Sequence, residues 1–189
     1  AVPGASRAPL RIYPSVIAEA VQGMEALLAE PYGCFEQTTS TTYPNVLVLD
    51  YLRRTGGDPA VAARAERLIA LGYQRLLGFE VLSEPGGFSL YGDAPAVPAI
   101  TAYGLQEFSD MSEVAFVDPA LLDRIVAYLE SRQFADGSWL LDRYSASAAS
   151  ADEGRIISTA YVVWGLADSG HADSYAVARG LDYLSGALA

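Results

Sequence analysis

Two side chains, Cys34 and Gln37, have types and a spacing that together allow covalent chemistry. Cys34 is the single cysteine of the 189-residue chain, and no histidine or lysine stands near it in sequence to activate it as a nucleophile. Attack of the Cys34 sulfur on the side-chain carbonyl of Gln37, with loss of ammonia, would close a ring that holds an internal thioester. A tight turn brings such residues together, and Gly33 lets the chain bend there. The spacing therefore indicates an activated acyl group that needs no cofactor.

The segment around this pair resembles a known signature. Cys34-Phe35-Glu36-Gln37 is similar to the Cys-x-Glu-Gln thioester motif of the α2-macroglobulin and complement superfamily. The flanking segments agree with it: Pro31-Tyr32-Gly33, Thr38-Thr39-Ser40, Tyr43-Pro44-Asn45-Val46 and Leu49-Asp50-Tyr51-Leu52. Phe35 stands where animal members usually carry glycine, and the Thr38-Thr39-Ser40 continuation is similar to bacterial α2-macroglobulin-like proteins. The resemblance covers most of the chain.

The resemblance implies that this is the thioester domain of a bacterial α2-macroglobulin-like protein, a broad-spectrum protease inhibitor. A protease would cut a bait region elsewhere in the parent protein, and one of its lysines would then attack the Gln37 carbonyl, with Cys34 as the leaving group. Because each molecule can transfer its acyl group only once, the resemblance implies an endopeptidase inhibitor and not an enzyme. It further implies no cofactor or metal, shielding by other domains of the parent, and a periplasmic or cell-envelope location outside the cytoplasm.

Two other kinds of function fit the same residues. In the first, the same chemistry attaches the protein covalently to a surface, as an opsonin or an adhesin does. In the second, the motif is vestigial and the domain is a noncovalent interaction module. A bait region in the full-length parent would favour the protease trap over the surface tag.

A histidine governs target choice in the complement-like members that the sequence resembles. In those that prefer hydroxyl groups, a histidine downstream of an Asp-Gly connector takes over the acyl group as an acyl-imidazole. The corresponding window here, residues 139–157, contains no histidine. His171 is the only histidine of the chain and follows the next expected helix, so we expect an ordinary loop residue. The resemblance then implies direct reaction with amines.

Composition excludes several classes of function. A net charge of −11 argues against a nucleic-acid partner, since phosphate binding requires clustered basic residues. No stretch approaches the roughly 20 consecutive apolar residues of a membrane span, so we expect no direct membrane contact. Residues 1–11 lack a signal-peptide pattern, and any targeting segment would lie outside this sequence. With 51% hydrophobic residues, the chain can form one domain with a substantial core.

The elements that must position Cys34 and Gln37 follow from helical periodicity and a repeat of 55 to 60 residues. One helix is expected from residue 14 to before Pro31, and another over 38–54, with Pro44 in its first turn or kinking it. Helices at 58–79, at 118–134 and from Asp173 begin with Asp, followed in the first two by Pro, which favours a helix start. Gly-rich connectors, which could form short extended pieces, follow the first two. Further helices should open at Thr101 and Thr159.

Units of two helices joined by Gly-rich aromatic connectors indicate an all-α fold, an α/α toroid with inner helices around an axis and outer helices wrapped on them. The third unit ends where its connector should follow, so we expect an incomplete toroid over residues 14–189, preceded by a connector at 1–13. Other α/α toroids act on isoprenoids or sugars, but one cysteine and one histidine cannot form a usual structural zinc site. Asp136 and Asp142 are expected to be solvated loop acids.

Overall fold

A computed structural model describes residues 23–140 and 151–187 of the chain. The expected connector at 1–13 and most of the first expected helix lie outside these ranges, and residues 23–25 are helical. The regular elements of the described ranges are α2 (Phe35–Thr55), α3 (Pro59–Leu77), α4 (Pro98–Val114), α5 (Pro119–Ser131), α6 (Ala151–Leu166), the π-helical turn η1 (Ala167–His171) and α7 (Tyr175–Ala187). The predicted all-α class is confirmed.

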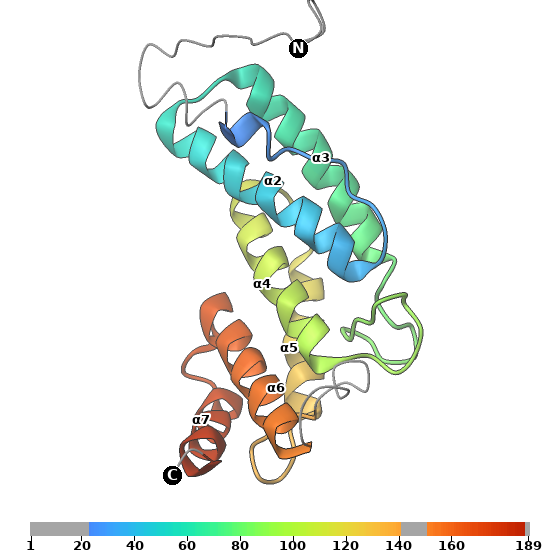
Figure 1. Ribbon diagram of the computed structural model, residues 1–189, viewed down its shortest axis with the longest axis vertical. Helices are drawn as coiled ribbons and strands as arrows, with labels where there is room; N and C mark the ends of the chain where they lie inside the picture. Colours follow the sequence, from blue (N-terminus) through green and yellow to red (C-terminus); the bar gives the residue numbers. More distant parts are fainter. Residues whose placement is uncertain (1–22, 141–150, 188–189) are drawn as a thin grey trace, which may run out of the picture.

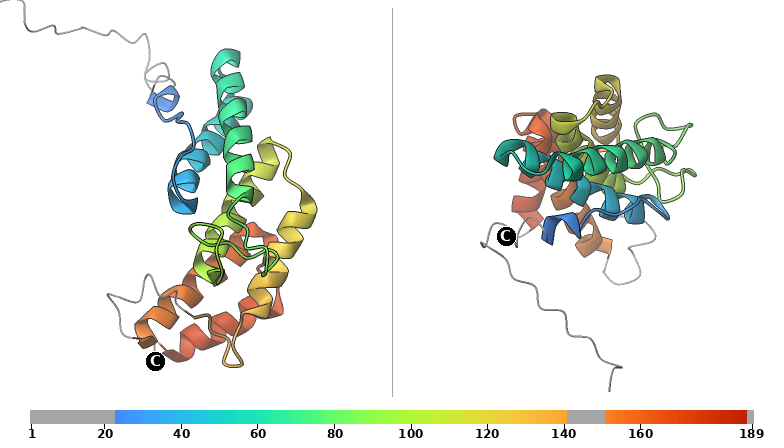
Figure 2. Two further views of the ribbon diagram at one scale, coloured as in Figure 1. Left: turned by 90° about the vertical axis from the view of Figure 1, so that its right-hand side faces the viewer. Right: turned by 90° about the horizontal axis from the view of Figure 1, so that it is seen from above.

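The helices form three pairs that lie one below another along the long axis of the molecule (Figure 1). Within the pairs, α2 packs on α3, α4 on α5, and α6 on α7. Between pairs, the contacts run from α2 to α4 and from α4 to α6. The left view of Figure 2 shows α2 and α6 on one side of the molecule and α5 on the other. Inner α2, α4 and α6 with outer α3, α5 and α7 are the arrangement that the repeat predicted.

The outer helices start as their sequence predicts. Asp58 and Asp118 are N-caps whose carboxylates accept hydrogen bonds from the backbone N–H of Ala60 at 2.7 Å and of Ala120 at 3.0 Å. The following prolines occupy the first helical positions, where the missing N–H costs nothing.

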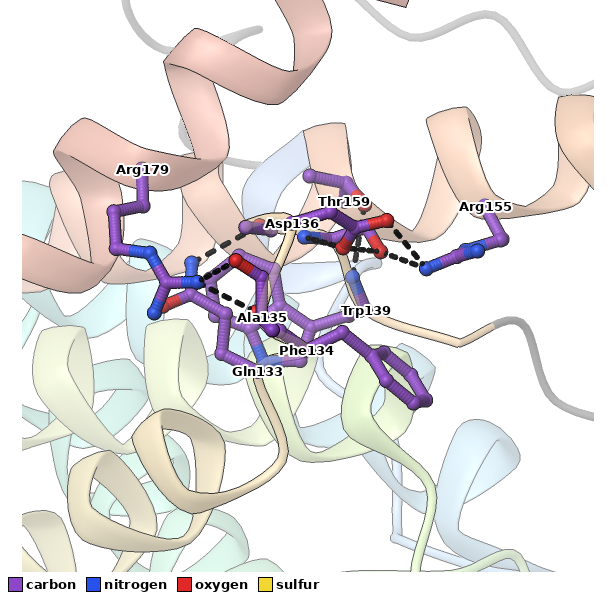
Figure 3. A network of polar contacts seen from close by, with 10 residues as sticks. Gln133, Phe134, Ala135, Asp136, Trp139, Arg155, Thr159 and Arg179 are labelled. Carbon is purple, nitrogen blue, oxygen red and sulfur yellow. Dashed lines mark hydrogen bonds and ion pairs between the residues drawn. The ribbon is translucent and has the colours of Figure 1, made fainter.

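An arginine six residues after the first aspartate of each outer helix ties that helix to the segment before its inner partner. Arg64 donates to the Leu28 carbonyl at 3.4 Å, and Arg124 makes two hydrogen bonds of 3.2 Å to the Glu80 carboxylate. Arg179 donates to the carbonyls of Phe134 and Ala135 at 2.8 and 2.6 Å (Figure 3). Each outer helix therefore holds the segment that leads into the inner helix of its own pair.

Threonines of two inner helices, Thr101 in the first turn of α4 and Thr159 in the middle of α6, bind the same segments. Thr101 accepts a hydrogen bond from the Phe88 N–H at 2.9 Å, and Thr159 accepts one from the Trp139 N–H at 3.0 Å (Figure 3). The short extended pieces expected here are reduced, in the described ranges, to one isolated bridge between Glu80 and Phe88. The connector before α4 thus meets the N-terminal end of that helix, and the connector before α6 meets the middle of α6.

Several helix boundaries differ from the expectation. The first expected helix should reach to before Pro31, but in the described residues it ends at residue 25. The helix expected to begin at Thr38 begins at Phe35, because Cys34 and Gln37 cap it. Pro44 is therefore well inside α2, so the first of its two expected roles, a place in the first turn, is wrong, and the expected kink stays a prediction. The helices expected to open at Thr101 and Thr159 begin earlier, at Pro98 and Ala151, since a proline at the first helical position starts α4. Within the described residues, no helix has the length and apolar character needed to cross a membrane.

Candidate functional site

Cys34 and Gln37 cap the start of α2 reciprocally. Cys34 is the N-cap residue with extended backbone, and its side chain faces the backbone N–H of Gln37. In return, the Gln37 Oε1 atom accepts a hydrogen bond from the Cys34 N–H at 3.2 Å. This is the arrangement of a capping box, which satisfies two otherwise free donors of the helix. It folds the Gln37 carboxamide back over Cys34, so the structure brings together the two residues that the sequence paired.

Gly33 makes room for this fold-back. Its φ of +75° is in the left-handed region, which a side chain disfavours. A Cβ at this position would lie 1.9 Å from Gln37 Oε1 and 2.7 Å from Gln37 Cδ. Only glycine therefore allows the carboxamide to occupy its place above the turn.

We expect Gly33→Ala to displace Gln37 as well as strain the backbone, with the backbone alone costing about 1–2 kcal/mol of unfolding free energy. The matched control is Gly56→Ala, at the other end of α2, where φ is +69° and a Cβ would meet nothing within 4 Å. Urea unfolding should show the backbone cost in both variants and a larger loss in Gly33→Ala, where the Gln37 cap is also displaced. Methylamine incorporation at Gln37 should fall about tenfold or more in Gly33→Ala alone. Equal incorporation in the two variants would contradict this role of Gly33.

Arg75 and Thr38 brace the turn before the cap. Arg75, on the outer helix α3, donates from Nη2 to the Gly33 carbonyl at 2.7 Å and from Nε to the Thr38 hydroxyl at 3.2 Å. Thr38 in turn donates to the Tyr32 carbonyl at 3.1 Å. The turn carrying Cys34 is therefore held by side chains of both helices of the first pair.

Phe35 anchors the start of α2 in the core. It is fully buried, with its ring centroid 6.0 Å from that of Phe79 and 5.5 Å from that of Phe88. Its backbone N–H donates to the Leu90 carbonyl at 3.0 Å. Cys34 is half-buried beside it, while Glu36 and Gln37 are exposed, and the Glu36 carboxylate complements the dipole of α2. The anchor thus holds the cap at the surface, where a nucleophile can reach it.

The family model described as "A-macroglobulin TED domain" matches residues 9–187. The chain belongs to this family. It is the thioester-containing domain of α2-macroglobulins and complement proteins. Curated relatives of this TED domain include α2-macroglobulin-like protein 1 of Mus musculus, 27% identical over 86% of this chain, and ovostatin of Gallus gallus, 26% identical over 96%. The chain spans only 12% and 13% of the length of these two proteins.

Solved structures support the fold of this TED domain. Native α2-macroglobulin of Escherichia coli, from its domain MG7 to the C-terminus, matches with a TM-score of 0.53 and 20% identity, over 93% of this chain and 31% of that one. Salmonella α2-macroglobulin reacted with methylamine matches with a TM-score of 0.54 and 21% identity, over 89% of this chain and 13% of that one. At these identities the likeness establishes the α/α toroid fold.

The other candidate side chains of the TED domain have ordinary roles. Asp136 binds the Ser138 hydroxyl at 2.7 Å and pairs with Arg155 at 2.9 Å (Figure 3), and the hydrogen bonds of Ser138 hold the Asp136 pKa below its usual value. Asp142 lies outside the described residues. His171 is half-exposed at the end of η1. Across residues 23–140 and 151–187, no cluster of His, Cys, Asp and Glu could hold a metal ion.

One buried acid on an inner helix was missed by the sequence reasoning. Glu107 of α4 is fully buried, and neither carboxylate oxygen has a hydrogen-bond partner in the described part of the chain. Burial raises the Glu107 pKa well above its usual value. The hydroxyl of Thr39, on α2, opposes this shift to a smaller extent, although no hydrogen bond of ordinary length joins the two side chains. Glu107 therefore remains protonated at a pH where an exposed glutamate ionises.

Glu107→Gln should stabilise the domain at neutral pH. The raised pKa means that the unfolded chain releases the Glu107 proton at a lower pH than the folded one, so the wild type loses stability as pH rises through that interval. Glutamine has a similar shape and no proton to lose. We expect the variant to gain about 1–3 kcal/mol over wild type at pH 7 and little at pH 4. Thermal unfolding of wild type and variant at both pH values measures this gain. An equal stability difference at pH 7 and pH 4 would contradict the prediction.

Proposed function

We propose that Cys34 and Gln37 form an internal thioester and that the parent protein of this TED domain uses it to trap proteases covalently. The observation that carries the proposal is the reciprocal cap, in which the Gln37 carboxamide is folded back onto the residue bearing the thiol. That geometry is held by Gly33, Arg75 and Thr38. Helix stability alone does not require a cysteine here, because a serine or an aspartate is a favourable N-cap residue. A cysteine at the N-cap, held by a left-handed glycine and an arginine from another helix, therefore favours a chemical role for Cys34.

The chemistry consists of two acyl transfers at the Gln37 Cδ atom. In the first, the Cys34 sulfur attacks Cδ, the C–N bond breaks, and the amide nitrogen leaves as ammonia with the thiol proton. In the second, an uncharged amine attacks the same carbon and the C–S bond breaks. The Cys34 thiolate leaves and takes up the proton that the amine gives away. The product is a stable amide, so the site acts once and the domain is an inhibitor module and not an enzyme.

The position of His171 supports direct attack by amines. Cys34 stands at the N-terminal end of α2, the same end of an inner helix that the connector before α4 meets at Thr101. His171 instead follows the C-terminal end of α6, a helix of 16 residues that is about 24 Å long. A histidine at that end is poorly placed to carry the acyl group, so the lysine of a protease would attack Gln37 directly.

The rest of the trap belongs to the parent. Because the chain spans about an eighth of the curated relatives, a bait region and the domains that shield Gln37 would lie in other parts of the protein. The bacterial α2-macroglobulins of similar fold favour a bacterial parent. We place that parent outside the cytoplasm, in the periplasm or on the cell envelope, where it would meet foreign proteases.

The test is proteolysis of the full-length parent by a protease of broad specificity. We expect a conjugate that survives denaturation, with an isopeptide bond between Gln37 and a protease lysine in its peptide digest. Treating the parent with methylamine first should remove the conjugate, because Gln37 is then already an amide. A protease that is inhibited without any covalent bond to Gln37 would contradict the proposal.

A further inference from the structure

Arg75 of the first helix pair has no arginine at the equivalent place of the second unit, where Ala135 stands. Arg64, Arg124 and Arg179 occupy the same place in α3, α5 and α7 and bind the preceding segments in every unit. Arg75 lies eleven residues beyond Arg64, near the end of α3, and the unit it belongs to is the one that carries Cys34 and Gln37. Its contacts with Gly33 and Thr38 are therefore additional to the arginine contacts that the three units share.

Arg75 is connected to the side-chain carbonyl of Gln37 through one peptide group, the one between Gly33 and Cys34. The guanidinium donates to the Gly33 carbonyl at 2.7 Å, and the N–H of that same peptide belongs to Cys34. This N–H donates to Gln37 Oε1 at 3.2 Å. A cationic donor on the oxygen of a peptide polarises it and strengthens hydrogen bonding by its N–H. Arg75, the Gly33–Cys34 peptide and the Gln37 oxygen thus form one chain of hydrogen bonds.

We infer that Arg75 is a positioning residue that makes the Cys34 N–H an oxyanion donor for acyl transfer at Gln37. This inference rests on the proposed thioester chemistry. When sulfur or an amine attacks Gln37 Cδ, the carbonyl π electrons move to the Gln37 oxygen, which becomes negative until the C–N or C–S bond breaks. A preoriented backbone N–H stabilises that charge more than it stabilises the neutral carbonyl. The 3.2 Å bond is long, as catalytic hydrogen bonds often are before the reaction.

The chain offers a matched control for Arg75. Arg67 lies on the same helix, is exposed, and has no contact with Gly33 or Thr38 in the described structure. Arg75 is exposed as well, so replacing either by methionine leaves the core of α3 intact. Arg75→Lys keeps the charge and one donor, and tests whether a cation on the Gly33 carbonyl is sufficient.

The experiment has two readouts. In this chain, the NMR shift of the Cys34 amide proton reports the hydrogen bond to Gln37 and is independent of thioester formation. In the full-length parent, the rate of methylamine incorporation at Gln37 reports the chemistry. We expect Arg75→Met to move the Cys34 amide proton upfield and to slow incorporation roughly three- to tenfold, less than the roughly hundredfold cost of deleting an oxyanion donor. Arg75→Lys should recover part of both, and Arg67→Met should change neither.

The two proposals fail in different ways. If wild-type parent incorporates no methylamine, the thioester proposal fails, and with it the catalytic role of Arg75, whatever the amide proton shows. If wild type incorporates methylamine and Arg75→Met does so at the same rate, the role of Arg75 is overturned and the thioester proposal stands. If Arg75→Met slows methylamine incorporation but leaves the Cys34 amide proton unmoved, the role of Arg75 is also overturned. Its effect on the rate would then not act through the Gly33–Cys34 peptide.

Discussion

A Cys34→Ala variant of the parent protein is expected to take up no methylamine at Gln37, a loss of more than about a thousandfold that reaches the detection limit. Without the sulfur, Gln37 remains an ordinary carboxamide, which amines do not attack at neutral pH. Peptide mass spectrometry after exposure to labelled methylamine measures this.

Cys34→Ser separates the chemistry from the helix cap. Serine is a favourable N-cap residue, so this variant should fold at least as stably as wild type while remaining as unreactive as Cys34→Ala. Label at Gln37 in either variant would show that something other than Cys34 activates the acyl group.

The second large effect is expected for Phe35→Ala, which should lower the free energy of unfolding by about 3–5 kcal/mol. The Phe35 ring is fully buried against Phe79 and Phe88. It also packs closely on Gly104, where a Cβ would come within 3.0 Å of the ring. Because Gly104 has no side chain, it cannot fill the cavity that Phe35→Ala leaves. Because Phe35 follows the cap directly, its loss should also loosen the Cys34 turn.

Tyr32→Ala is the control for Phe35→Ala, because Tyr32 lies just before the same turn but is 58% exposed. Its removal should change stability by less than about 0.5 kcal/mol. Urea unfolding of both variants decides the matter. A loss of similar size in the two would mean that burial of Phe35 does not anchor α2.

The paired helices could be predicted because their signals are local. Asp58 and Asp118 followed by proline mark outer helices that begin where expected, and the repeat placed the inner helices between them. The pairing of Cys34 with Gln37 was also predictable, since a turn brings residues at this spacing together. The capping and turn signals extend over a few residues, and the repeat of 55 to 60 residues connects them along the chain.

Of the features that escaped prediction, the start of α2 is local and the other two depend on contacts far apart in sequence. The start of α2 at Phe35 depends on capping geometry, which tolerates Pro44 further along the helix. Arg75 reaches Gly33 across 42 residues, and nothing near Arg75 in the sequence indicates this contact. Glu107 stands in a helix with an otherwise ordinary inner pattern, and its burial depends on how α4 packs.

The measurement that tests the internal thioester most directly is the intact mass of the full-length parent before and after methylamine, together with a count of free thiols. Our account predicts a native protein lighter by one ammonia than its sequence, with Cys34 unreactive toward thiol reagents. Methylamine should then add one equivalent at Gln37 and release one thiol at Cys34. A native mass that equals the sequence, with Cys34 already free and no gain on methylamine treatment, would contradict the account.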